Sequence, residues 1–259
     1  MLKFRILSLA SVFFALLVSA QDKTQPSEAR LAGITARGRL LAEYDVAAWH
    51  ATDAVQAAKP EQGTVERYIA RKTDAGWVVA FGRLNEARDQ FLVKYEAIQG
   101  KSPDDFSVKT YDSVQAVSTF YLAAARGLDL ALKDFQAENH RYNTYVLPAE
   151  SDQLYVYILP AQTKRDVYPL GGDVRYLVST DGSKIVEKRQ MHKSIIEFRG
   201  NAPQGAKVAS GFHDHVLSEI PEDSDVFYVL NRRPRMSEYI GAGKHVYEVK
   251  TDGTIRVEK

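Results

Sequence analysis

Residues 211–225 read Gly-Phe-His-Asp-His-Val-Leu-Ser-Glu-Ile-Pro-Glu-Asp-Ser-Asp, and the interpretation of the chain starts from this stretch. It contains two of the six histidines, His213 and His215, one residue apart. On a β-strand, residues i and i+2 project from the same face, so both imidazoles can point to one place. The sequence therefore predicts a pair of metal ligands here.

Three carboxylates after this pair could supply a third ligand: Asp225, Glu222 or Glu219. Two histidines, one carboxylate and an open position form a ligand set that catalytic zinc uses. His192 could approach the same point from a neighbouring strand, but its context favours an exposed histidine at a strand end. In the alternative interpretation, the stretch is a solvated acidic loop to which the two histidines only donate hydrogen bonds.

The first twenty residues are typical of a secretory signal peptide. Lys3 and Arg5 precede an apolar run over 6–17, and 18–20 form a small-residue cleavage site. The apolar run is too short for a membrane anchor, so no stable anchor is expected after cleavage. We therefore expect a periplasmic or secreted protein.

Composition narrows the class of protein further. Without residues 1–20 the net charge of +1 becomes −1, so the chain lacks the excess of positive charge that is typical of nucleic-acid-binding proteins. The chain has no cysteine, which excludes disulfides and cysteine nucleophiles. It also lacks the serine-elbow, phosphate-loop, dinucleotide and His-Glu-x-x-His motifs. Without disulfides, the hydrophobic core must stabilise the fold. The sequence gives no indication of oligomeric state.

The region 21–100 is predicted to be a helix plus a small antiparallel sheet. Apolar residues at helical spacing run from a cap at Ser27 to about Ala58. The segment 65–98 alternates apolar and polar residues on both sides of a turn at 73–76, which is typical of hairpins.

The region 101–259 is predicted to be an α+β domain that carries the candidate metal site. Apolar residues step by three and four from Asp112 onward, which predicts a long core helix over 112–138. Short strands follow, with a hairpin turn at 180–183. Helices early and strands late favour the α+β class, with a helical and small-sheet N-terminal half and a mixed or antiparallel sheet in the C-terminal half.

Residues 211–255 resemble the metal-binding core of the JAMM (MPN-type) metallopeptidases. That family has a His-x-His pair at a strand end, a loop with a proline and a serine, and an aspartate three positions after the serine. Here His213 and His215 precede a loop to Pro221, and Asp225 stands in the place of the aspartate. The loop is one residue shorter, and Glu222 replaces the serine.

The resemblance implies a zinc ion bound by His213, His215 and Asp225, with water at the fourth position. A glutamate would move the water's proton to the leaving amine. Glu150, after the predicted core helix, is the first choice for this role and Glu187 the second. The implied activity is hydrolysis of an amide bond in a peptide or a cell-wall fragment.

Two other interpretations stay open. One is a binding or structural module that has a similar scaffold and performs no chemistry. The other is a cupin-like site, because the spacing of His213, His215 and Glu219 matches the first cupin motif, although the glycines of that motif and a second motif are missing.

Overall fold

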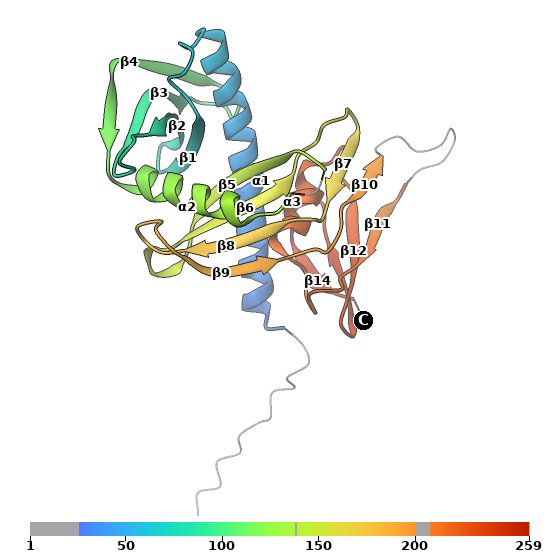
Figure 1. Ribbon diagram of the computed structural model, residues 1–259. Helices are drawn as coiled ribbons and strands as arrows, with labels where there is room; N and C mark the ends of the chain where they lie inside the picture. Colours follow the sequence, from blue (N-terminus) through green and yellow to red (C-terminus); the bar gives the residue numbers. More distant parts are fainter. Residues whose placement is uncertain (1–25, 138, 200–207, 259) are drawn as a thin grey trace, which may run out of the picture.

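The computed structural model describes residues 26–137, 139–199 and 208–258. In these ranges the chain is an α+β protein with three α-helices and four sheets (Figure 1). The predicted signal peptide, residues 1–20, lies outside the described residues. None of the helices in the described ranges has the length and apolar character needed to cross a membrane.

The first helix, α1 (Glu28–Ala57), is the longest element. The Ser27 side chain caps it by accepting a hydrogen bond from the Arg30 amide, as the sequence predicted. Alanine and leucine dominate its buried positions, and one of these positions needs a glycine. A Cβ atom added at Gly38 would lie 2.4 Å from the Cβ of Val226, so the third helix can approach α1 closely only because Gly38 has no side chain.

The first sheet is antiparallel, with strand order β1-β2-β3-β4. The predicted turn at 73–76 joins its first two strands. The expected region boundary near 99–102 falls in the turn between the last two strands, which pair with each other, so the sheet continues across it. The strand bounds are β1 (Arg67–Thr73), β2 (Gly76–Leu84), β3 (Phe91–Gln99) and β4 (Phe106–Val117).

The predicted core helix over 112–138 needs correction. Helix α2 (Phe120–Asp134) accounts for its second part, but 112–117 belong to β4. Val114 and Val117 happen to continue the helical spacing of the apolar residues that follow them. Their segment pairs with β3, and this tertiary contact overrides the local pattern.

The second sheet is also antiparallel, with order β5-β6-β8-β9, and the predicted turn at 180–183 joins its last two strands. A two-stranded ribbon of β7 and β10 extends from it. The bounds are β5 (Tyr142–Pro148), the 3-10 turn η1 (Glu150–Asp152), β6 (Leu154–Pro160), β7 (Val167–Leu170), β8 (Val174–Val178), β9 (Ile185–Gln190) and β10 (Ile196–Arg199).

The C-terminal sheet has the order β11-β12-β13-β14. Its first two strands are parallel because helix α3 connects them, and the other pairs are antiparallel. The bounds are β11 (Ser210–Asp214), α3 (Asp223–Asn231), β12 (Ser237–Ala242), β13 (His245–Val249) and β14 (Ile255–Val257).

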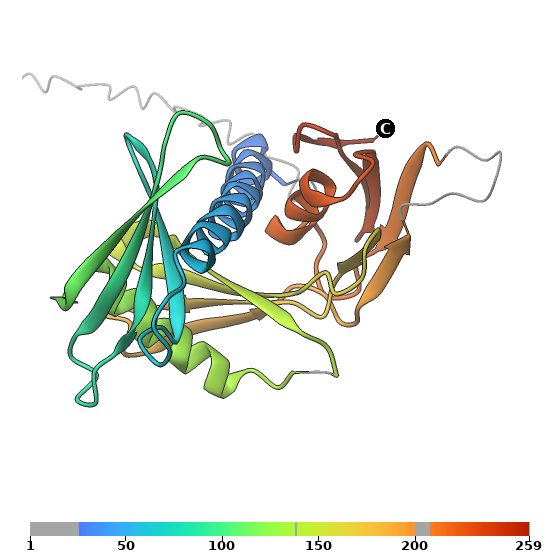
Figure 2. The same ribbon diagram turned by 90° about the horizontal axis from the view of Figure 1, so that it is seen from above.

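Helix α1 connects the parts of the molecule. Figure 2 shows it between the first sheet and α3, above the second sheet. One apolar core lies between α1, the first sheet and strands β5 and β6, a second surrounds α2, and a third joins α1 to α3 and the C-terminal sheet. The third core fixes the position of α3, and with it the residues at the start of that helix.

Candidate metal centre

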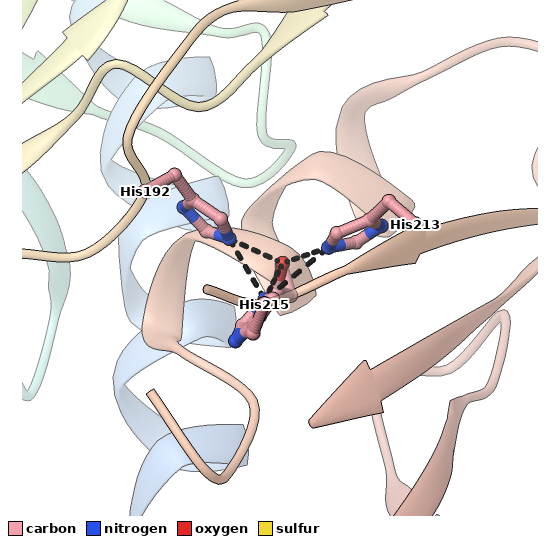
Figure 3. Close-up of side chains that lie close together, drawn as sticks. His192, His213 and His215 are labelled. Atoms are coloured by element: carbon pink, nitrogen blue, oxygen red, sulfur yellow. Dashed lines mark hydrogen bonds and ion pairs between the residues drawn. The ribbon is translucent and has the colours of Figure 1, made fainter. Parts of the chain in front are cut away.

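Four buried side chains from three segments converge at one point. We call them the histidine–aspartate group: His192, His213, His215 and Asp225. His192 follows the end of β9, His213 lies on β11, His215 comes directly after that strand, and Asp225 is in the first turn of α3. Figure 3 shows the three imidazoles pointing toward one another around a carboxylate oxygen.

Five of the distances between the ligand atoms are close to those of a tetrahedral site. The three histidines contribute Nε2 and the aspartate contributes Oδ1, all within 4.8 Å of one another. Nε2 of His215 is 2.9 Å from that of His192, 3.3 Å from that of His213 and 3.4 Å from Oδ1 of Asp225. The same oxygen is 3.1 Å from His213 Nε2 and 3.2 Å from His192 Nε2. Ligands about 2.0–2.1 Å from a tetrahedral centre are about 3.3 Å apart.

Hydrogen bonds at the start of α3 hold the Asp225 side chain in place. Glu222 is the N-cap of α3, and the two residues form a capping box. The Glu222 amide donates to Oδ2 of Asp225 at 2.6 Å, which orients the carboxylate so that Oδ1 lies near all three histidines, while Oδ2 is 3.2 Å from Nε2 of His215. Arg189, on β9, holds the Glu222 carboxylate with two hydrogen bonds of 2.5 and 3.1 Å. The second sheet therefore anchors the start of α3.

Each histidine has a partner behind it that fixes its ring. Nδ1 of His192 is 2.8 Å from Oδ1 of Asp173, and Nδ1 of His213 is 2.9 Å from Oε1 of Glu238. Nδ1 of His215 is 3.0 Å from the carbonyl oxygen of Ile220. A carboxylate or carbonyl oxygen accepts a hydrogen bond here, so each Nδ1 carries a proton, and Nε2 is the nitrogen left to bind a metal once the ring has only that proton. Metal-binding histidines have such partners.

The centre attracts positive charge. Burial alone would lower the pKa of His192, but Asp173 and Asp225 raise it well above its usual value. Burial likewise opposes ionisation of His213, yet Asp225 and Glu238 raise its pKa to about 9. Burial would raise the pKa of Asp225, and the histidines around it hold that pKa well below its usual range.

One metal cation can interact with all four ligand atoms of this group at once, which a proton cannot do. Three Nε2 lone pairs and a carboxylate oxygen converge so closely that they repel one another unless a cation lies between them. A proton serves one pair of atoms, whereas a metal ion serves all four. Three imidazoles and one oxygen in tetrahedral geometry suit zinc, while magnesium and calcium prefer oxygen ligands. The residues present therefore fit a zinc ion.

The structure brings His213, His215 and Asp225 together. The other two carboxylates that the sequence offered as a third ligand are elsewhere: Glu219 is exposed, and Glu222 is bonded to Arg189. The cupin-like alternative needs Glu219 in the site, and the C-terminal sheet has a β-α-β arrangement instead.

The two glutamates considered as the catalytic base are not among the four side chains that converge. Glu150 is exposed in the 3-10 turn between β5 and β6. Glu187 is exposed on β9, five residues before His192.

Sequence reasoning missed the role of His192. We expected an exposed strand-end histidine, but its exposed fraction is 8% and it belongs to the group. It lies 21 positions before His213, and the tertiary structure brings the two rings together, with 5.8 Å between their centroids. The sole signal in the sequence was that it follows a predicted strand.

Comparison with known proteins adds no assignment. No family model matches the sequence, and the searches of curated proteins and of solved structures gave no match. The candidate site must be interpreted from its own geometry.

Proposed function

We propose that this chain is a zinc-binding protein in which the ion joins the second sheet to the C-terminal sheet. The observation that carries the proposal is the fourth protein ligand. His192 stands where the JAMM resemblance implies water, so protein atoms supply all four ligands. Zinc sites with four protein ligands are typically structural, whereas catalytic sites keep a position open.

The location of the ligands supports a structural role. His192 belongs to a segment between the second sheet and the β7–β10 ribbon, while the others belong to the C-terminal sheet and α3. The ion would therefore join segments that are distant in the sequence. The chain has no disulfide to do this, and a metal that binds only the folded state stabilises that state.

The test is the metal content of the untagged protein, measured by mass spectrometry beside a His213→Ala/His215→Ala variant. We expect about one zinc per wild-type chain and none in the variant, because two of four ligands are gone. His140→Ala is the matched control, since His140 contacts the Ala161 carbonyl far from the group. A wild-type protein that holds no zinc after zinc is supplied and the excess removed would overturn the proposal.

Zinc-dependent amide hydrolysis is the second candidate. It is supported by one observation: His213, His215 and Asp225, the three ligands that the resemblance implies, converge at one point. Removing His192 would open the fourth position to water. If the chain is such a hydrolase, the zinc-loaded wild type cleaves peptide or cell-wall amides. If the site is structural, neither wild type nor His192→Ala does.

A further inference from the structure

Residues of α3 also line a cavity that shares no residue with the histidine–aspartate group, so the metal proposal has no bearing on it. This cavity, of about 550 Å³, opens between α1, β1, β5 and α3. Its size is in the range of small-molecule sites. We call it the Asp45 pocket, after the carboxylate in its lining; its other main walls are Trp49, Tyr68, Tyr145 and Phe227.

Asp45 is a carboxylate without a cationic partner. Oδ1 accepts a hydrogen bond of 2.8 Å from the Tyr145 hydroxyl, and Oδ2 accepts one of 3.2 Å from the Asn231 amide. Both donors are neutral, and no described lysine or arginine forms an ion pair with Asp45. Burial raises the pKa of this carboxyl, although the two hydrogen bonds lower it. A carboxylate in this setting gains from an incoming cation.

The two arginines of the pocket are committed to other partners. Nη1 of Arg232 donates to Glu238 at 2.6 Å. Nη1 of Arg233 donates to the carbonyls of Leu230, Asn231 and Arg232, at the C-terminal end of α3. Neither arginine neutralises Asp45, so the charge remains for a ligand.

The walls are aromatic, and one of them is exposed. The side chain of Trp49 is 62% exposed and stacks only on His50, with the two ring centroids 4.7 Å apart. It lies one helical turn from Asp45. The rings of Tyr145 and Phe227 pack edge to face, with 5.5 Å between their centroids. Aromatic faces near a carboxylate attract organic ammonium groups through cation–π contacts.

We propose that the Asp45 pocket binds a small organic ammonium compound, with the ammonium group on Asp45 and an apolar body against the aromatic walls. The convergence of a carboxylate that lacks a cation with Trp49, Tyr68, Tyr145 and Phe227 in one cavity carries this assignment. An ammonium group would donate to the carboxylate while the neutral donors Tyr145 and Asn231 keep their places.

The two tryptophans make the test direct, because the chain has one in the pocket and one outside it. Trp49 lines the pocket, whereas Trp77 is a buried residue of β2 outside the pocket. In a nitrogen-15 NMR titration of the whole protein, 2-phenylethylamine is the ammonium probe and 3-phenylpropan-1-ol is its neutral counterpart. We expect the amine to shift the Trp49 indole signal, with a Kd of about 1 mM or lower, and to leave Trp77 in place. The alcohol should bind at least about 10-fold more weakly.

Two variants test whether the Asp45 carboxylate supplies the charge that binds the amine. Asp45→Asn keeps an oxygen for the Tyr145 hydroxyl and should weaken amine binding at least about 10-fold. Asp53→Asn changes an exposed carboxylate on the same helix, outside the pocket, and should leave binding unchanged. No Trp49 shift up to about 10 mM amine, equal binding of amine and alcohol, or full amine binding by a folded Asp45→Asn variant would each overturn the proposal. If the Asp45→Asn variant does not fold, the difference between amine binding and alcohol binding in the wild-type protein tests the proposal.

Discussion

Asp173→Asn removes one negative charge from behind the histidine–aspartate group without removing a hydrogen bond. Asp173 is buried, with Oδ1 bonded to His192 and Oδ2 without a partner. An asparagine of the same shape keeps an oxygen for Nδ1 of His192. The asparagine amide also places N–H donors without a partner where Oδ2 lay, so zinc affinity, rather than the stability of the fold, reports the electrostatic contribution.

The expected loss follows from Coulomb's law. Across the imidazole, the Asp173 carboxylate lies about 6 Å from a zinc ion bound to Nε2. Zinc together with the Asp225 carboxylate carries a net charge of +1. At an effective dielectric constant of about 20, this attraction is about 2.8 kcal/mol, or about 100-fold in affinity. Asp173 also favours the protonated His192 that competes with zinc, which offsets part of the loss. We expect zinc affinity to fall about 10- to 100-fold, the usual range for such partners.

The assay is a competition titration of the metal-free protein against a chromophoric zinc chelator at fixed pH. Asp74→Asn is the control, because Asp74 is exposed in the turn between β1 and β2, away from the group. Zinc affinity of Asp173→Asn within twofold of that of wild type would refute the argument that a charged partner behind His192 supports the ion.

Three further predictions concern pH, packing and the glutamates. The pKa of His213, raised from 6.5 to about 9, makes the metal-free protein lose stability as pH rises between these values, by at most about 3 kcal/mol. Zinc affinity rises over the same window because zinc needs the neutral ring, and the two effects offset each other, so denaturation scans should show stability falling with pH without zinc and staying level with saturating zinc. Gly38→Ala should lower the free energy of unfolding in urea by about 1–3 kcal/mol because α3 is displaced, whereas Gly33→Ala on the same helix, where the added Cβ would make only an ordinary contact of 3.4 Å with Nη1 of Arg37, should raise it by about 0.5–1 kcal/mol. Glu150→Gln and Glu187→Gln should leave zinc content and zinc affinity unchanged, and a zinc-dependent hydrolysis abolished by either would contradict the structural role.

Local patterns predicted much of the fold. The Ser27 cap and the apolar spacing after it predicted α1 almost to the residue. The turns at 73–76 and 180–183 predicted two hairpins, because glycine and aspartate there suit the reversal. The error at 112–117 has a physical reason. Val114 and Val117 fit a helix by spacing, but the sequence does not show that β3 has an edge for this segment to join.

Local sequence patterns predicted part of the candidate site. His213 and His215 share a face because they are two residues apart, and Asp225 follows at a distance that a loop and a helix start can cover. His192 could not be assigned in this way. Its approach depends on tertiary contacts, such as that of Arg189 on β9 with Glu222 at the start of α3, and no local pattern encodes them. Missing this ligand favoured an open, hydrolytic site over a closed one.

X-ray absorption at the zinc edge tests directly whether protein atoms supply all four zinc ligands. On the zinc-loaded protein, we expect four ligands at about 2.0–2.1 Å, three of them imidazoles. The His192→Ala variant should then show two imidazoles and gain a water. A wild-type spectrum with two imidazoles and bound water, identical to that of the variant, would contradict the account and favour the hydrolase.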